Sequence, residues 1–160
     1  SMKDLWWDIR PSPALGTLEL RFCDQPATLR EAMAIVAFAH CLAHWFRDHE
    51  AEWTQTHNPL KRWIIRENKW RVIRFGLQAD IVVSPTGKTK RLSEDIEDWL
   101  DAVADYARRL NYTNHISTIH QILSKGNSAS RQHQIFADTH DLMAVVKHNV
   151  REFELQHPVW

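Results

Sequence analysis

The chain has 160 residues, of which 44% are hydrophobic and 25% are charged, a composition that predicts one folded domain and excludes intrinsic disorder. Twenty basic residues balance twenty acidic ones, so the net charge is zero, which excludes a protein that coats nucleic acid non-specifically. The two cysteines cannot form a disulfide framework, and they indicate a reducing compartment such as the cytoplasm.

Two short segments near the start have the sequence pattern of a β-hairpin. Leu5 to Arg10 is rich in aromatic residues, and Thr17 to Phe22 alternates polar and apolar residues, as a half-buried strand does. The segment between them, Pro11 to Gly16, contains the residues typical of turns. We therefore expect an antiparallel pair in which Leu18, Leu20 and Phe22 face the core.

A long apolar helix is predicted after the hairpin. Thr28 and Glu31 have the spacing of a capping box, which places a helix start at Leu29 and an end near Trp53. The apolar run 32–46 inside it is too short to cross a membrane and surrounds the helix nearly completely. We expect this helix to be central and covered on most sides, and we expect no membrane partner.

Four further helices and a second small hairpin complete the predicted fold. The signals place helices at 60–75 after a cap at Asn58-Pro59, from a cap at Ser93 to Leu110, at 113–125, and from a cap at Ser128 or Ser130 to Leu155, with strands at 79–83 and 88–92. The predicted class is α+β and predominantly α-helical, with about five helices in a single domain, 1–160. Residues 1–24 would carry the strands with the site, and residues 25–160 the helices.

The predicted N-terminal hairpin concentrates charged side chains on one face. Residues two apart in a strand share a face, so Asp8 and Arg10 can lie beside Glu19 and Arg21. Carboxylates hold Mg²⁺, and arginines stabilise charge on a transferring phosphoryl group. The alternative is that cross-strand ion pairs decorate an ordinary solvent-facing sheet.

The predicted second helix carries an aromatic and charged stripe. Trp63, Glu67, Trp70 and Arg74 share one face, and Arg71 lies beside Glu67. The stripe belongs to a segment, 61–91, with nine basic and two acidic residues. Such a stripe could bind an anionic ligand or stack nucleobases. Alternatively, Glu67 pairs with a nearby arginine while the indoles pack on guanidinium groups and the core.

Two histidines and one cysteine are further candidate site residues. His40 and His44 have the helical spacing that can chelate a metal, but no third ligand is evident nearby, and a structural pair in the core is expected. Cys23 follows the charged strand, yet the sequence places no base beside it, so no role as a nucleophile is assigned.

Three segments carry a resemblance to a known family. Residues 7–13, WDIRPSP, followed by GTLELR at 16–21 and by Asp24, resemble the carboxylate–amine ligases of the glutamate–cysteine ligase type 2 family. Residues 67–77, ENKWRVIRFGL, and residues 126–132, GNSASRQ, resemble later segments of the same family in the same order. The resemblance extends over nearly the whole chain and is to the C-terminal part of a protein more than twice as long.

This resemblance implies a fold and a chemistry. The family is grouped with the glutamine synthetase superfamily, so the chain would be a C-terminal fragment of a glutamine synthetase-like catalytic fold. The intact enzyme would use ATP to form an amide through an acyl-phosphate intermediate. By resemblance, Glu19 would bind Mg²⁺, and Arg21 and Arg10 would contact the phosphate or the substrate carboxylate. Asn68, Arg71 and Arg74 would bind substrate or ATP, with Arg131 and Gln132 as weaker candidates.

The resemblance also implies partners. They are ATP with Mg²⁺ as cofactor, a small carboxylate such as glutamate, an amine such as cysteine, and the N-terminal half of the same protein, which carries the family's other metal ligands. Without that half we expect the isolated chain to be inactive, and its hairpin edge either to pair with a second copy in a homodimer or to fray. The alternative function is a non-catalytic helical binding module that uses the basic, Trp-rich helix on a phosphate-bearing partner, while nucleic acid is not expected as one.

Overall fold

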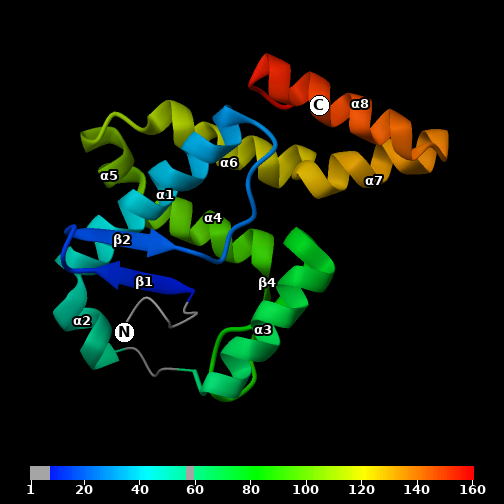
Figure 1. Ribbon diagram of the computed structural model, residues 1–160. Helices are drawn as coiled ribbons and strands as arrows, with labels where there is room; N and C mark the ends of the chain where they lie inside the picture. The colour runs from blue at the N-terminus through cyan, green and yellow to red at the C-terminus, as the bar shows by residue number, and fades with distance from the viewer. Residues whose placement is uncertain (1–7, 57–59) are drawn as a thin grey trace.

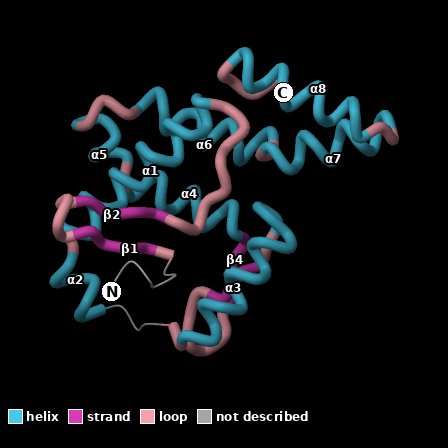
Figure 2. Tube along the Cα trace, viewed as in Figure 1, coloured by secondary structure: helices cyan, strands magenta, loops and turns pink. Residues whose placement is uncertain are grey.

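The computed structural model describes residues 8–56 and 60–160, and the fold is helix-rich α+β (Figure 1). Two small antiparallel sheets, each of two strands, accompany eight α-helices within these ranges (Figure 2). The strands are β1 (Ile9–Ser12), β2 (Thr17–Leu20), β3 (Asp80–Val82) and β4 (Thr89–Arg91). The helices are α1 (Leu29–Asp48), α2 (Glu50–Thr56), α3 (Arg62–Phe75), α4 (Leu92–Ala102), α5 (Ala104–Arg109), α6 (Thr113–Lys125), α7 (Ser128–Thr139) and α8 (Leu142–Leu155), and the short 3₁₀ helix η2 spans Gly76–Gln78.

The helix number differs from the expected five because three of the expected helices are each broken once. The first breaks at His49, which ends α1 before α2 begins, and the third breaks at Val103 between α4 and α5. The fifth breaks at His140, whose backbone is left-handed, and Asp141 then caps α8 by accepting a hydrogen bond from Met143 N.

Helix starts show where side-chain caps are used. Thr28 caps α1 as expected, since its hydroxyl accepts from Glu31 N at 3.2 Å. The expected cap at Ser93 is wrong: α4 follows β4 directly, and Leu92 N donates to Ala79 O at 2.9 Å. Asn127, and neither Ser128 nor Ser130, caps α7. The expected cap at 58–59 lies outside the described residues.

The core lies between α1, α4, α5 and α6. Its fully buried members include Cys41, Leu100, Val103 and Ala107. The opposite side of α1 is open, because Val36 keeps 60% of its surface exposed. The expectation that α1 is covered on most sides is therefore wrong, since α6 and α5 cover one side only.

The first hairpin also differs from its expected packing. β1 begins at Ile9 and includes Pro11, which the prediction placed in the turn, and residues 5–7 of the expected strand lie outside the described residues. Leu18, Leu20 and Phe22 expose 58%, 39% and 54% of their surfaces, so they do not face the core of this chain. The apolar face of the hairpin is consequently open.

Candidate functional site

The charged face of the β1–β2 hairpin is assembled as the alternation predicts. Arg10 is directly opposite Glu19 in the strand register, and Arg21 N donates to Asp8 O at 2.8 Å two pairs further along. Arg10 Nη2 lies 2.6 Å from one Glu19 carboxylate oxygen, and Arg21 Nη1 lies 3.1 Å from the other. One carboxylate is therefore held between two guanidinium groups.

This arrangement decides which ligands the hairpin face fits. Asp8 of the same face is paired with Lys69, so Glu19 is the carboxylate that the two arginines share, and both arginine side chains are partly buried, at 22% and 25% exposure. Guanidinium groups bind carboxylate and phosphate through paired hydrogen bonds and do not lose their charge. The face therefore fits an anion that would share these arginines with Glu19.

The same face fits a Mg²⁺ ion less well. Both Glu19 oxygens already accept from arginines, and no group of three or more His, Cys, Asp or Glu side chains that could hold a metal occurs among residues 8–56 and 60–160. Mg²⁺ prefers an octahedral shell of oxygen ligands. The described side chains do not supply such a shell, and the expected Mg²⁺ ligand role of Glu19 stays a prediction.

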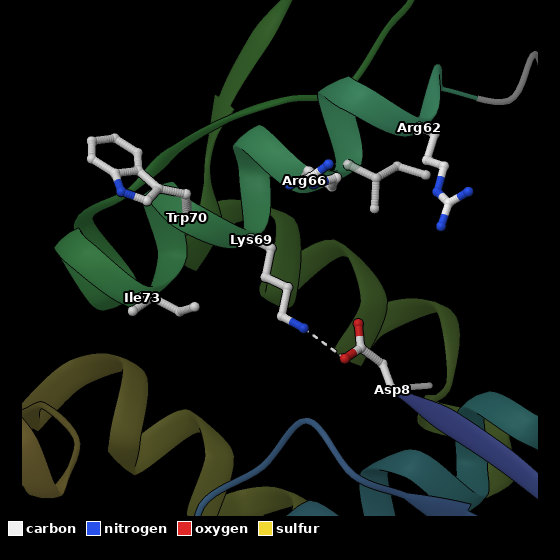
Figure 3. Close-up of a pocket in the computed structure, with 7 residues that line it drawn as sticks. Asp8, Arg62, Arg66, Lys69, Trp70 and Ile73 are labelled. Atoms are coloured by element: carbon white, nitrogen blue, oxygen red, sulfur yellow. Dashed lines mark hydrogen bonds and ion pairs between the residues drawn. The ribbon is translucent and has the colours of Figure 1, made fainter. Parts of the chain in front are cut away.

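The hairpin contacts helix α3 through Asp8. Asp8, which shares the face, reaches α3 with its side chain: Lys69 Nζ donates to Asp8 Oδ1 at 2.6 Å (Figure 3). A hollow of about 570 Å³ lies at this junction. Figure 3 shows Arg62 and Lys69 extending from α3 on the side of Asp8, whereas Trp70 projects elsewhere. Lining residues are Asp8, Arg62, Ile65, Arg66, Lys69, Trp70 and Ile73.

Three of these lining residues were missed by the sequence prediction: Arg62, Arg66 and Lys69. Arg62 and Arg66 are exposed and make no hydrogen bond or ion pair with any residue the structure describes. The sequence does indicate this cationic face, because helical spacing places positions 62, 66, 69 and 73 on one side of the helix. The sequence prediction selected the neighbouring face, which contains Trp63. Only the position of the hairpin shows which of the two helix faces lines the hollow.

Two of the predicted substrate-binding residues on α3 point to the other sheet. Asn68 donates to Val82 O and accepts from Val82 N, both at 2.8 Å, as a neighbouring strand would. Arg71 donates to Glu67 at 2.9 Å and to Asp80 O at 3.0 Å. Arg74 lies exposed in the last turn. The structure thus uses Asn68 and Arg71 to hold α3 against β3, and the expected ligand roles of all three stay predictions.

The tryptophans of α3 do not pack in the core. Trp63 and Trp70 expose 66% and 56% of their surfaces, and Trp70 meets Phe75 edge-on with ring centroids 6.0 Å apart. The ion pair of the structural alternative, between Glu67 and Arg71, does form, but the packing of the indoles on the core does not. The aromatic surface of α3 is therefore open to a ligand or a partner.

The late segment 126–132 supplies a buried charge cluster. Arg131, with a side chain only 6% exposed, contacts Glu31 of α1 at 2.9 Å and Glu152 of α8 at 2.6 Å. Its guanidinium also lies 4.8 Å from the Trp160 ring. Gln132 donates to Ser128 Oγ at 3.0 Å. Arg131 thereby joins three helices.

The histidine pair contacts Tyr112, and Cys23 follows the charged strand. His40 Nε2 and His44 Nε2 are 3.1 Å apart, and His40 Nδ1 is 3.2 Å from the Tyr112 hydroxyl. His40 is exposed, so the expected placement of the pair in the core is wrong. Partial burial and, secondarily, Asp24 raise the pKa of the Cys23 thiol, which keeps it protonated at neutral pH.

Comparison with known proteins adds a family. The model of glutamate–cysteine ligase family 2 matches residues 1–148. A relative from Bdellovibrio bacteriovorus, whose printed name is "Putative glutamate--cysteine ligase 2", is 38% identical over 146 residues, covering 91% of this chain and 38% of the relative. A relative of the same name from Gloeobacter violaceus is 38% identical over 91% of this chain and 39% of its own length. "Putative glutamate--cysteine ligase 2-1" from Frankia alni is 35% identical over 99% of this chain and 42% of its own length.

The matched residues, 1–148, include the charged hairpin, α3 and Arg131. The chain spans about two fifths of the length of the curated relatives it matches. No helix within the described ranges is both long and apolar enough to cross a membrane. Since the family model covers most of the sequence, the chain belongs to glutamate–cysteine ligase family 2.

Proposed function

We propose that the protein to which this chain contributes is an ATP-dependent carboxylate–amine ligase. The observation that carries the proposal is the pairing of Glu19 with both Arg10 and Arg21 on a hairpin that contacts α3 through the ion pair of Asp8 with Lys69. An enzyme that phosphorylates a carboxylate must bind two anions together, and clustered arginine and lysine side chains lower the repulsion between them.

The proposed reaction has two steps, and the arginines and the lysine of this chain bind the reacting anions. A carboxylate oxygen of the first substrate attacks the γ-phosphorus of ATP, the bond to the ADP oxygen breaks, and an acyl phosphate forms. The amine nitrogen then attacks the acyl carbon, phosphate leaves, and the nitrogen loses a proton as the amide forms. Arg10 and Arg21 would bind the carboxylate and the transferring phosphoryl group, and Arg62, Arg66 and Lys69 would bind the polyphosphate.

The proposed partners of this chain are its substrates, Mg²⁺ and the remaining part of the same protein. Glutamate and cysteine are the proposed carboxylate and amine, ATP would enter with Mg²⁺, and the remaining part of the protein would complete the metal site. The isolated chain would be inactive, because Glu19 is its one carboxylate placed between the arginines of the hairpin. The open apolar face of Leu18, Leu20 and Phe22 supports an additional covering element, either that remaining part or a second copy.

A second candidate function rests on α3 alone. Arg62 and Arg66, without partners among the described residues, lie on the helix that also exposes Trp63 and Trp70. This combination would suit a non-catalytic module that binds a phosphate-bearing partner. Such binding would weaken steeply between about 50 and 200 mM salt.

The test measures ADP release by the whole protein with ATP, Mg²⁺, glutamate and a panel of amines that includes cysteine. Glu19→Ala and Arg21→Ala should each abolish the amine-dependent rate, because both alter the shared anion site. Arg151→Ala, at an exposed position of α8, is the matched control and should leave the rate unchanged. A folded whole protein that releases no ADP with any amine would reject the ligase and favour the binding module.

A further inference from the structure

A second hollow lies beneath the segment that joins β2 to α1. Residues 23–27 form one wall, and the helices α1, α4 and α6 and the start of α7 form the others. Its volume of about 610 Å³ is within the range of small-molecule sites, which are usually lined by apolar side chains with a few polar groups. The phosphate chemistry proposed for the hairpin and α3 does not use this hollow.

The floor of the hollow is apolar and rests on the core. Its side chains come from α1, α4 and α6, and four of the six pack directly against the buried core cluster. The six are Ile35, Phe38, Ile96, Ile119, Ile122 and Leu123. Because the floor is built on the best-packed helices, the hollow has a preformed apolar surface.

The mouth of the hollow offers a carboxylate but no cation. No Lys or Arg is among its lining residues in the described parts of the chain. Glu31 lines it, but its two oxygens are engaged by Thr28 and Arg131. Asp24, by contrast, is exposed and has no hydrogen bond or ion pair with any described residue. The free charge at the mouth is therefore negative.

We propose that this hollow binds a primary amine with an apolar body, its ammonium group at Asp24 and its alkyl chain against α1 and α6. A ligand that carried an acid group into the hollow would find no lysine or arginine among the described lining residues, whereas an alkylamine matches the charge of Asp24 and the apolar floor. Cys23 in the lining is two residues beyond Arg21, which places the mouth within about 7 Å of extended chain from the arginine face. Only the use of the bound amine as the attacking group rests on the proposed ligase function.

Titration of the ¹⁵N-labelled chain with butylamine, pentylamine and hexylamine tests this binding without ATP. Saturable shifts are expected at the amides of residues 23–25, 27 and 119–132. Affinity should rise about fourfold for each added CH₂ group, because each one removes apolar surface from water. Hexanoate should bind at least threefold more weakly than hexylamine, since its charge opposes that of Asp24.

Three variants assign the effect to the hollow. Ala129→Leu places a larger side chain at the mouth and should abolish the hexylamine shifts, while Ala137→Leu, an exposed position of the same helix outside the lining, should preserve them. Asp24→Asn should weaken hexylamine about threefold and leave 1-hexanol unchanged. Absence of saturable shifts, equal binding of hexanoate, or full binding by Ala129→Leu would overturn the proposal.

The role of the amine in catalysis is judged separately. If the whole protein releases ADP with glutamate and hexylamine, and Ala129→Leu removes that rate but not the rate with a small amine, the hollow is an amine subsite of the ligase. If hexylamine binds the chain but supports no ADP release, the hollow is not an amine subsite of the ligase. The ligase assay with the other amines then still decides the proposed function.

Discussion

Asp8 and Lys69 are 61 residues apart in sequence, yet the Asp8 carboxylate accepts a hydrogen bond from Lys69 Nζ at 2.6 Å. Asp8 belongs to the charged face of the hairpin, and Lys69 belongs to the cationic side of α3. The contact joins the hairpin to the side of α3 that carries Arg62, Arg66 and Lys69 (Figure 3). Among the described residues Asp8 pairs with Lys69, whereas Arg62 and Arg66 on the same side of α3 make no ion pair.

Removal of Lys69 should weaken anion binding without unfolding the protein. Lys69→Met deletes one of three cations, so the dissociation constant of tripolyphosphate should rise about threefold to tenfold, as measured by calorimetry on the chain at low salt. The ion pair with Asp8 is about half exposed, and its loss should change the free energy of unfolding by less than about 1 kcal/mol. Lys147→Met, at an exposed position on α8, is the control, and equal tripolyphosphate affinity in both variants would contradict the prediction.

Arg131 should be essential for stability because it neutralises two buried carboxylates. The side chains of Glu31 and Glu152 are 5% and 0% exposed, and Arg131→Met removes the guanidinium that lies between them. Breaking such a buried cluster costs about 3–5 kcal/mol, a large share of a domain's stability. Urea unfolding followed by tryptophan fluorescence measures this loss.

Two controls accompany the Arg131 measurement. Arg131→Lys should recover only part of the loss, because one ammonium group cannot reproduce the forked contacts of a guanidinium. Arg151→Met removes an exposed arginine of α8 and should stay within about 0.5 kcal/mol of the parent. A loss below 1 kcal/mol in Arg131→Met would show that the cluster is not desolvated.

Local sequence signals predicted much of the fold. The alternation of 17–22 fixed which side chains share a face, and the Arg10–Glu19 pair follows from it. Glycines at 76 and 126 ended helices as expected, because both have positive φ values of 55° and 94°. At His49 and Val103 no glycine or proline marks the helix breaks, so they depend on tertiary packing and could not be predicted.

The site was harder to predict than the fold. The charged hairpin residues were identified because strand alternation is local. The cationic face of α3 was not, because its choice over the tryptophan stripe depends on where the hairpin lies. The double hydrogen bond from Asn68 to Val82 likewise joins a helix to a strand whose relative position no local pattern specifies.

Asn68 should therefore be tested as a structural residue as well as a ligand. Asn68→Ala leaves the N–H and C=O of Val82 without their partners, which should cost about 1–3 kcal/mol. Hydrogen exchange at Val82 should accelerate, because the donated bond to Asn68 Oδ1 is lost. Asn114→Ala, at an exposed position of α6, should change neither quantity. Unchanged exchange at Val82 in Asn68→Ala would leave the ligand role as the better explanation.

Asp48 should contribute an acid-sensitive part of the stability. Hydrogen bonds from Arg47, and secondarily from Tyr106 of α5, lower the pKa of this carboxyl below its usual value of 3.8. The unfolded chain then binds the proton more tightly than the folded chain does, so stability rises with pH through this range. The contribution is present above about pH 4 and is lost as the pH falls through the lowered folded-state value.

Thermal unfolding midpoints between pH 6 and pH 2.5 test the role of Asp48. In Asp48→Asn the side chain cannot titrate, so the midpoint should fall less on acidification than in the parent, although it starts lower at pH 6 because the ionic contact with Arg47 is gone. Asp101→Asn removes an exposed carboxylate of α4 that has no partner among the described residues, and it should retain the full acid dependence of the parent. Parallel pH curves for the parent and Asp48→Asn would mean that the Tyr106–Asp48 contact, 3.1 Å in length, contributes no proton-linked stability between α1 and α5.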